Sequence, residues 1–375
     1  MIFLNRWQGV LLAFLMMILL AGRLEPLAGI HQIDFWLVWL VSMVVLALPV
    51  LLLESALAKR TKALPLQALP ALTRDADASP TWRIVGWLAI LGVLLLAGSL
   101  AAQVGTLVNN AVAVYPNQQT LPANILKLLP FIILIIALVL SYIPKGLPIF
   151  GVVLLLGVVG VDLTQGVSLS VWQWTAFTWV EWSSVVVLAL ASTGLGLGLY
   201  WASALTNQTK GQSDTPHRTV LPIWLTQVIA GFIFALGLTT TQVADVHTAA
   251  THVSIVVTLY ALAALIGAGI LLSFARQQLM ARDFNPMVTS ILILVSLAVW
   301  VLPIQDYLLT AAIVVAIMIT AIYAIFSGWK MKSSHLRKAL NFNNEALYNV
   351  WRVQIRILVP LAVVLAIAGL IGQYV

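Results

Sequence analysis

The residues best placed for chemistry lie where two apolar segments are interrupted. One interruption is the run STGLGLG at Ser192–Gly198, in which glycine recurs at alternate positions. Each glycine weakens a helix by about 1 kcal/mol relative to alanine, so we expect this helix to break. A broken helix leaves backbone carbonyls free to bind a cation and backbone N–H groups free to bind a carboxylate. The run therefore predicts a binding site built largely from backbone.

The other interruption lies near the N-terminus. An apolar run ends at Gly22, Arg23, Glu25 and Pro26, and apolar residues resume at Leu27–Ile30. The two interrupted segments are five segments apart, and interrupted helices at corresponding positions of two repeats mark the binding site of secondary transporters. The alternative is that the glycines only allow neighbouring helices to pack closely. The matching break near Gly22 favours transport.

Two further sets of polar residues lie within apolar segments. Glu54 ends an apolar helix, and a carboxylate there generally needs a partner. It either supports the interrupted segment or reaches the headgroups beside Lys59. Gln103, with Asn109 and Asn110, either faces an outer vestibule or forms hydrogen bonds between helices.

No pattern typical of an enzyme accompanies these residues. The chain has no P-loop, no His–Glu metal motif and no nucleophile elbow. There is no cysteine, which excludes disulfides and thiolate metal sites, and the five histidines are scattered. We therefore predict a protein that is not an enzyme and has no resident cofactor.

The elements that must position these residues are membrane helices. The chain is 62% hydrophobic and 8% charged, and its apolar runs are continuous, whereas a β-barrel would show short alternating strands. We predict an all-α membrane protein that forms a single domain over residues 1–375. The eleven expected helices lie near 7–22, 35–57, 82–110, 126–143, 147–165, 181–205, 219–239, 251–276, 286–303, 306–330 and 348–373.

The Lys and Arg residues between these segments fall mostly on one side of the membrane. With a cytoplasmic N-terminus, only Arg23 and Lys127 of the 19 Lys and Arg residues fall outside. This asymmetry follows the positive-inside rule, so the net charge of +7 reflects topology, not nucleic-acid binding. We predict a multi-pass protein of the inner (plasma) membrane with an external C-terminus. The longest cytoplasmic loop, Ala58–Thr81, is expected to be a solvated connector.

The chain resembles the neurotransmitter:sodium symporter family, which has the leucine-transporter (LeuT) fold. The resemblance spans nearly the whole chain and rests on several motifs in order. These are LALPVLLLESALAKR at 46–60, WRIVGWLAILGVLLLAG at 82–98, ASTGLGLGLYWASAL at 191–205, FSGWKMKSSHLRKALNF at 326–342 and LYNVWRVQIRILVPLAVV at 347–364. The resemblance implies two inverted repeats of five helices, about 7–165 and 181–330, with an extra helix at about 348–373.

The resemblance also implies a site and an activity. Members of this family carry amino acids or related amines inward with sodium, between the breaks of segments 1 and 6. Arg23 matches the arginine that closes the outer gate, facing Glu25 or another acid, and Glu54 would hydrogen-bond the unwound part of segment 6. The implied substrate-binding residues are Leu20, Ala21, Gly22, Ser99, Gln103, Ala189, Ser192, Thr193, Gly194 and Leu195.

The chain departs from the family at the ion sites. Leu20 stands where the family has a sodium-binding asparagine, and Ile266 and Gly267 stand where it has hydroxyl side chains. Sodium needs several oxygen ligands, so both familiar sites are expected to be severely weakened and sodium binding is doubtful.

These observations leave two functions open. The first is a secondary transporter of small amino acids or related amphipathic solutes by alternating access, with degenerate sodium sites. The second is a non-transporting membrane scaffold or regulatory subunit derived from the same family. Segment 1 separates them, because a transporter should unwind near Leu20–Arg23 and a scaffold can keep a continuous helix. A major-facilitator permease would instead have twelve helices. The expected partners are membrane lipids, a small-molecule substrate, and a protein partner or a second copy.

Overall fold

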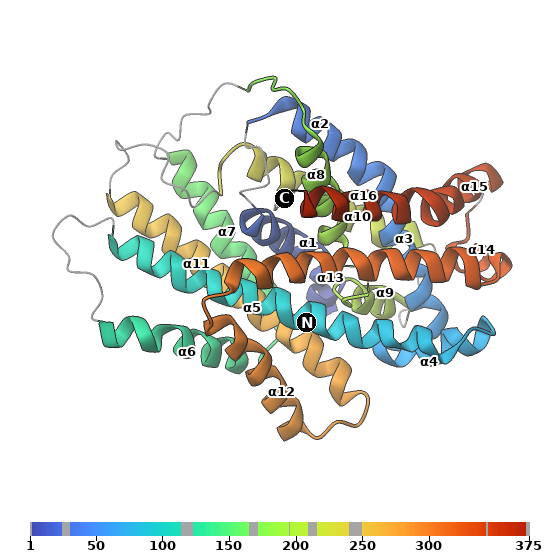
Figure 1. The fold of residues 1–375 in the computed structure, drawn as a ribbon, viewed down its shortest axis with the longest axis horizontal. Helices are drawn as coiled ribbons and strands as arrows, with labels where there is room; N and C mark the ends of the chain where they lie inside the picture. Colours follow the sequence, from blue (N-terminus) through green and yellow to red (C-terminus); the bar gives the residue numbers. More distant parts are fainter. Residues whose placement is uncertain are drawn as a thin grey trace.

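The computed structural model describes residues 2–24, 31–113, 123–164, 172–194, 196–208, 216–239, 250–342 and 344–372, and this part of the chain is helical (Figure 1). Its α-helices are α1 Ile2–Arg23, α2 Ile33–Ser42, α3 Leu48–Thr61, α4 Pro65–Asp75, α5 Ile84–Ala113, α6 Ala123–Leu140, α7 Leu147–Thr164, α8 Trp179–Thr193, α9 Trp201–Gln208, α10 Pro216–Ala235, α11 Ala250–Met280, α12 Pro286–Ala298, α13 Gln305–Ile325, α14 Ser333–Leu340, α15 Glu345–Val353 and α16 Val359–Ile371. The all-α class is confirmed for these residues.

In the described part of the chain, three π-helical turns adjoin longer helices; two continue into a following α-helix and one ends its helix. They lie at Met43–Ala47, between α2 and α3, at Phe326–Lys330, directly after α13, and at Gln354–Leu358, between α15 and α16. Isolated π turns of this kind are frequent at functional sites.

The helices agree in position with the predicted membrane segments. Within the described residues, seven helical stretches are long and apolar enough to cross a membrane. Four shorter apolar helices, Trp7–Arg23, Leu128–Leu140, Trp179–Thr193 and Pro286–Val301, fall on four of the other predicted segments. The exact count of eleven spans stays a prediction.

The centre of the bundle is a pair of long helices, α5 and α11. Helix α11 also packs against α7 and α6, α13 packs against α5 and α16, and α1 lies against α10 (Figure 1). The core between them is apolar, and its largest fully buried side chains include Trp36, Trp39, Trp201 and Trp300.

The expected solvated connector at Ala58–Thr81 is wrong in part, because it contains helix α4. Leu66, Leu69 and Leu72 of α4 are buried, since their spacing of three residues places them on one helix face. Arg60 closes the turn with an ion pair to Asp75 at 2.6 Å. Helices α4, α14 and α15 lie at the same end of the molecule (Figure 1).

Candidate functional site

The predicted break in the sixth segment is confirmed between α8 and α9. Helix α8 ends at Gly194, whose backbone is left-handed with φ of 56°. Gly196 and Gly198 are also left-handed, with φ of 76° and 85°, and α9 begins at Trp201. Only glycine adopts these angles without strain. The alternate glycines therefore end the helix and turn the chain.

The break is also a place of close packing. A β-carbon at Gly196 would collide with Tyr323 and Ile319 of α13, and one at Gly198 would approach Gln278 of α11 and Pro65 of α4. Glycine is therefore needed at these positions for its backbone angles and for its size.

Side chains from α10, α11 and the break itself donate hydrogen bonds to the backbone carbonyls at the break. Gln227 donates from Nε2 to the carbonyl of Ser192 at 2.8 Å, and Tyr200 donates from Oη to the same carbonyl at 3.2 Å. Gln278 donates from Nε2 to the carbonyl of Leu197 at 3.3 Å. These bonds compensate for the missing helical ladder, so the break is held by designated partners in α10 and α11.

Several buried polar atoms around the break have no hydrogen-bond partner in the described part of the chain. They are both carboxyl oxygens of Glu54, Oε1 of Gln227, Oε1 of Gln278 and Oη of Tyr323. The expected hydrogen bond from Glu54 to the unwound stretch is therefore absent here. Glu54 is 1% exposed. Such a group of unpaired polar atoms is unusual in a protein core.

A small cavity beside Glu54 and a larger pocket lie next to each other. A small cavity is lined by Glu54, Ser55 and Tyr200, and it shares Thr219 and Ile223 with a second pocket. The second pocket has a volume of about 120 Å³ and is lined by exposed groups such as Trp7 and Arg218. Both carboxyl oxygens of Glu54 have less than 1 Å² of accessible surface, so the carboxyl is closed off from the second pocket in this structure.

Helix α1 differs from the expectation for a transporter, because it does not unwind at Leu20–Arg23. It is one α-helix from Ile2 to Arg23, and the N–H of Leu24 bonds the carbonyls of Leu20 and Ala21. Residues Val10–Ala21 are apolar and contain neither glycine nor proline, so local preference favours the helix up to Ala21. Carbonyls in the helical ladder are not free to ligate a cation. Residues 25–30, including Glu25 and the resumed apolar run, lie outside the described residues.

The region where the resemblance would place sodium is filled by leucine. A β-carbon at Gly267 of α11 would collide with the side chain of Leu19 and lie 3.3 Å from Leu100. Leu20 is buried as well, at 3% exposure. The apolar side chains of α1 and α5 therefore occupy the space beside Ile266 and Gly267.

The polar residues predicted to bind substrate bond their own helices instead. The hydroxyls of Ser99, Ser192 and Thr193 each donate to the carbonyl three residues earlier, at 2.6 to 2.8 Å. These three residues and Ala189 have no solvent-accessible surface, so no water-sized space lies against them. Gln103 is buried with Oε1 unpaired, and Leu195 lies outside the described residues.

Ala21, Gly22 and Arg23 lie at the end of α1 and meet groups from α11 and α13. Gly22 packs directly under the hydroxyl of Tyr260, which leaves no space for a β-carbon. Ala21 is fully buried. Asp306, in the first turn of α13, is an acid near Arg23, and the two side chains form no ion pair in the described part of the chain.

Sequence reasoning missed the residues that hold the break, which are Tyr200, Gln227, Gln278 and Tyr323. A signal was present, because Gln227 and Gln278 are rare polar side chains within apolar helices. Their partners are carbonyls on distant segments, which periodicity does not identify.

Comparison with known proteins identifies the fold. No family model and no curated protein matches the chain. The crystal structure of MhsT in complex with L-phenylalanine matches with a TM-score of 0.66 and 18% identity, over 96% of this chain and 98% of that chain. MhsT has the LeuT fold, so the likeness supports a LeuT fold and a multi-pass membrane protein, whereas the two inverted repeats stay a prediction. Membership of the symporter family stays a prediction.

Proposed function

We propose that the chain is a LeuT-type secondary transporter for a small amino acid or a similar amphipathic solute, without sodium at the two family positions. The observation that carries this proposal is the break between α8 and α9. A helix broken in the middle of a membrane bundle costs backbone hydrogen bonds, and this chain retains the break and supports it with Gln227, Tyr200 and Gln278. Such a break is the feature around which secondary transporters bind their solute.

The absence of sodium coupling is supported by α1 and α11. Leu20, Ile266 and Gly267 offer no side-chain oxygen, and Leu19 occupies the space against Gly267. The backbone carbonyls of α1 are committed to a continuous helix up to Arg23. A hard cation would find few oxygen atoms in this place.

Glu54 is the group we propose for coupling to protons instead. It is an ionisable side chain inside a membrane helix, which is a functional position by default. Glu54 and Tyr200, a residue of the break, line one small cavity, and a second pocket shares Thr219 and Ile223 with that cavity. Tyr200 lines the small cavity with Glu54, and Arg218 lines the neighbouring pocket.

An amino acid is the proposed substrate class because the similar structure of MhsT contains L-phenylalanine. The break offers backbone groups of both signs, which suits a solute that carries an amine and a carboxylate. The side chains packed around the break, including Tyr323 and Leu199, would limit the size of the substrate.

The test is uptake of labelled amino acids into proteoliposomes that contain the purified protein. We expect uptake that is unchanged when choline replaces sodium, that increases with an imposed proton gradient, and that is lost in Glu54→Gln. The matched control is Glu345→Gln, which removes an exposed carboxylate at the surface. Uptake that requires sodium, or that Glu54→Gln leaves unchanged, would contradict the proposed coupling.

A second candidate function is favoured by the continuous helix α1. A LeuT-type bundle that keeps α1 helical through Leu20–Arg23 fits a non-transporting scaffold or regulatory subunit. This function predicts no uptake and no thermal stabilisation by any amino acid in sodium or in choline. It also predicts a protein partner that co-purifies with the wild-type chain in mild detergent.

A further inference from the structure

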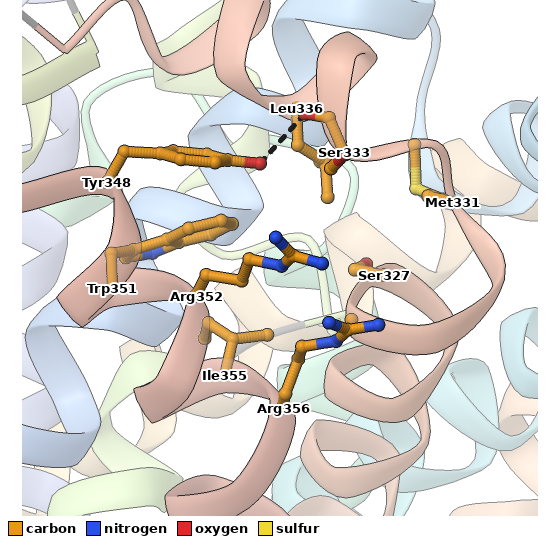
Figure 2. Close-up of a pocket in the computed structure, with 10 residues that line it drawn as sticks. Ser327, Met331, Ser333, Leu336, Tyr348, Trp351, Arg352, Ile355 and Arg356 are labelled. Carbon is orange, nitrogen blue, oxygen red and sulfur yellow. Dashed lines mark hydrogen bonds between the residues drawn. The ribbon is translucent and has the colours of Figure 1, made fainter. Parts of the chain in front are cut away.

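A second polar pocket lies between the end of α13, the start of α14 and the α15–α16 helix, and none of its lining residues belongs to the break. Its volume is about 170 Å³. Its polar lining comes from Ser327, Ser333, Tyr348, Arg352 and Arg356 (Figure 2). The proposed transport function does not use this pocket.

Two guanidinium groups determine the charge of the pocket. Arg352 and Arg356 are four residues apart on one helix, and both side chains point into the pocket (Figure 2). No acidic residue lines it, and neither arginine forms an ion pair in the described part of the chain. Like charges at this spacing repel each other. The pocket therefore favours an anion.

Unpaired polar atoms accompany the two arginines. The hydroxyl of Ser327 has no hydrogen-bond partner among the described residues, and Ser327 is only 1% exposed. The Nε atom of Arg356 is also buried without a partner. Buried donors without acceptors are rare and costly, so an acceptor-rich ligand would stabilise this pocket.

The backbone around the pocket is unusual on both sides. Ser327 and Gly328 lie in the π turn Phe326–Lys330, and Arg356 lies in the π turn Gln354–Leu358. The turns approach so closely that a β-carbon at Gly328 would lie 3.2 Å from the Cα of Arg356. Two facing π turns are an independent mark of a functional site.

The pocket is held open by fixed contacts. Trp329 donates from Nε1 to the carbonyl of Arg356 at 3.1 Å, and the Arg356 guanidinium lies 4.7 Å above its ring. Tyr348 donates to the carbonyl of Ser333 at 2.8 Å, which ties α15 to α14. Trp351 donates to the carbonyl of Pro49 at 3.0 Å, which ties α15 to α3. Binding would therefore require little ordering of the walls.

The surroundings are those of a membrane surface. Lys330, Lys332 and Lys338 lie near the pocket in sequence, at the end that the charge pattern assigns to the cytoplasm. Below the arginines, Val353, Ile357 and Leu361 form an exposed apolar stripe along the same helix. A ligand with an anionic head and apolar chains fits both features.

We propose that this pocket binds a phosphate group. Arginine pairs present parallel N–H donors that match phosphate oxygens, and Ser327 adds a hydroxyl donor. The phosphate has two possible sources, the headgroup of an anionic phospholipid and a soluble phosphate. The exposed stripe at Val353, Ile357 and Leu361 favours the lipid.

The test measures thermal unfolding of the full chain in a phosphate-free detergent. The probes are dioctanoyl phosphatidylglycerol, dioctanoylglycerol with the same chains but no phosphate, and inorganic phosphate. We expect phosphatidylglycerol to raise the unfolding midpoint and dioctanoylglycerol to leave it unchanged. In Arg352→Gln, the concentration of phosphatidylglycerol needed for half the shift should rise about tenfold, because one charge-assisted bidentate contact is lost.

The matched control is Lys338→Gln, which removes one exposed positive charge from the same end and should bind like the wild type. Ser327→Ala keeps the charge and should weaken binding about threefold, so it tests the pocket even when Arg352→Gln does not fold. A shift with inorganic phosphate that is lost in Arg352→Gln would also support the site and identify a soluble ligand. Equal shifts with dioctanoylglycerol, or shifts that none of the pocket variants changes, would overturn the proposal.

Discussion

The α8–α9 pair and helix α1 contact each other, yet the backbone of the pair leaves the helical conformation and that of α1 does not. The α8–α9 chain leaves the helix at three left-handed glycines and gives its carbonyls to side chains of other helices. Helix α1 keeps its ladder to Arg23 and fills its surroundings with leucine and methionine.

This difference shows which half of the predicted binding region contains polar groups that could bind a solute. Polar backbone, Glu54, Gln227 and Gln278 gather around α8–α9. Around α1, the corresponding space is apolar and closely packed, as Leu19 against Gly267 illustrates. A bound solute would therefore depend mainly on the α8–α9 side.

The largest effect should come from removing the conformational freedom of the break. Gly196→Val forces a β-branched residue into a left-handed backbone and into the ring of Tyr323, at a cost of about 4 kcal/mol. The thermal unfolding midpoint should fall by about 5 °C, because the entropy of unfolding grows with chain length. Gly160→Val is the control, since nothing lies within 4 Å of a β-carbon there, and it should leave the midpoint nearly unchanged. Similar midpoints for the two variants would remove the distinction between the break and an ordinary helix.

A polar residue placed in α1 tests whether that helix can regain an ion site. Leu20→Asn removes a buried apolar side chain and buries an amide, which should cost about 3 kcal/mol. Because the carbonyls of α1 are in the helical ladder, the variant should show the same midpoint in sodium and in choline. Stabilisation by sodium alone would mean that α1 can unwind. The two regions would then differ in their side chains but not in the ability of their backbone to leave the helix.

The close contact between α1 and α11 can be measured by a double-mutant cycle. Gly22→Ala introduces a β-carbon under the hydroxyl of Tyr260, which should destabilise the protein by about 2 kcal/mol. Tyr260→Phe removes that hydroxyl, so the double variant should recover about 1 kcal/mol relative to the sum of the single changes. Additive effects would show that α1 is not packed against Tyr260 at this point.

The smallest effect should come from the start of α8, where the helix is ordinary. Thr178 and Glu181 form a capping box, with Glu181 accepting from the N–H of Thr178 at 2.6 Å and Thr178 accepting from the N–H of Glu181 at 3.2 Å. Thr178→Ala should cost about 1 kcal/mol, visible as a small fall in the unfolding midpoint. Thr164→Ala, at the exposed end of α7, is a control that should have no effect. A loss as large as that of Gly196→Val would mean that the break is not the critical part of this segment.

Local pattern predicted most of the helices and the position of the break. The glycines at 194, 196 and 198 carry their conformational preference in any context, so the break was readable from spacing alone. The end of α1 near Gly22 was also expected, whereas its continuity through Leu20–Arg23 was not expected of a transporter. Helix α4 was missed because its short amphipathic pattern is interrupted by Pro70.

By itself, the sequence determined that the chain is a helical membrane protein, which way its charges predict it to face, and where one helix must break, because hydrophobic length and backbone preference act locally. Only the tertiary structure decided which side chains hold the break and that Glu54 has no hydrogen-bond partner among the described residues. It also decided that Ser327, Arg352 and Arg356 line one pocket. These outcomes depend on contacts between segments far apart in the chain, which apolar helices of similar composition do not specify individually.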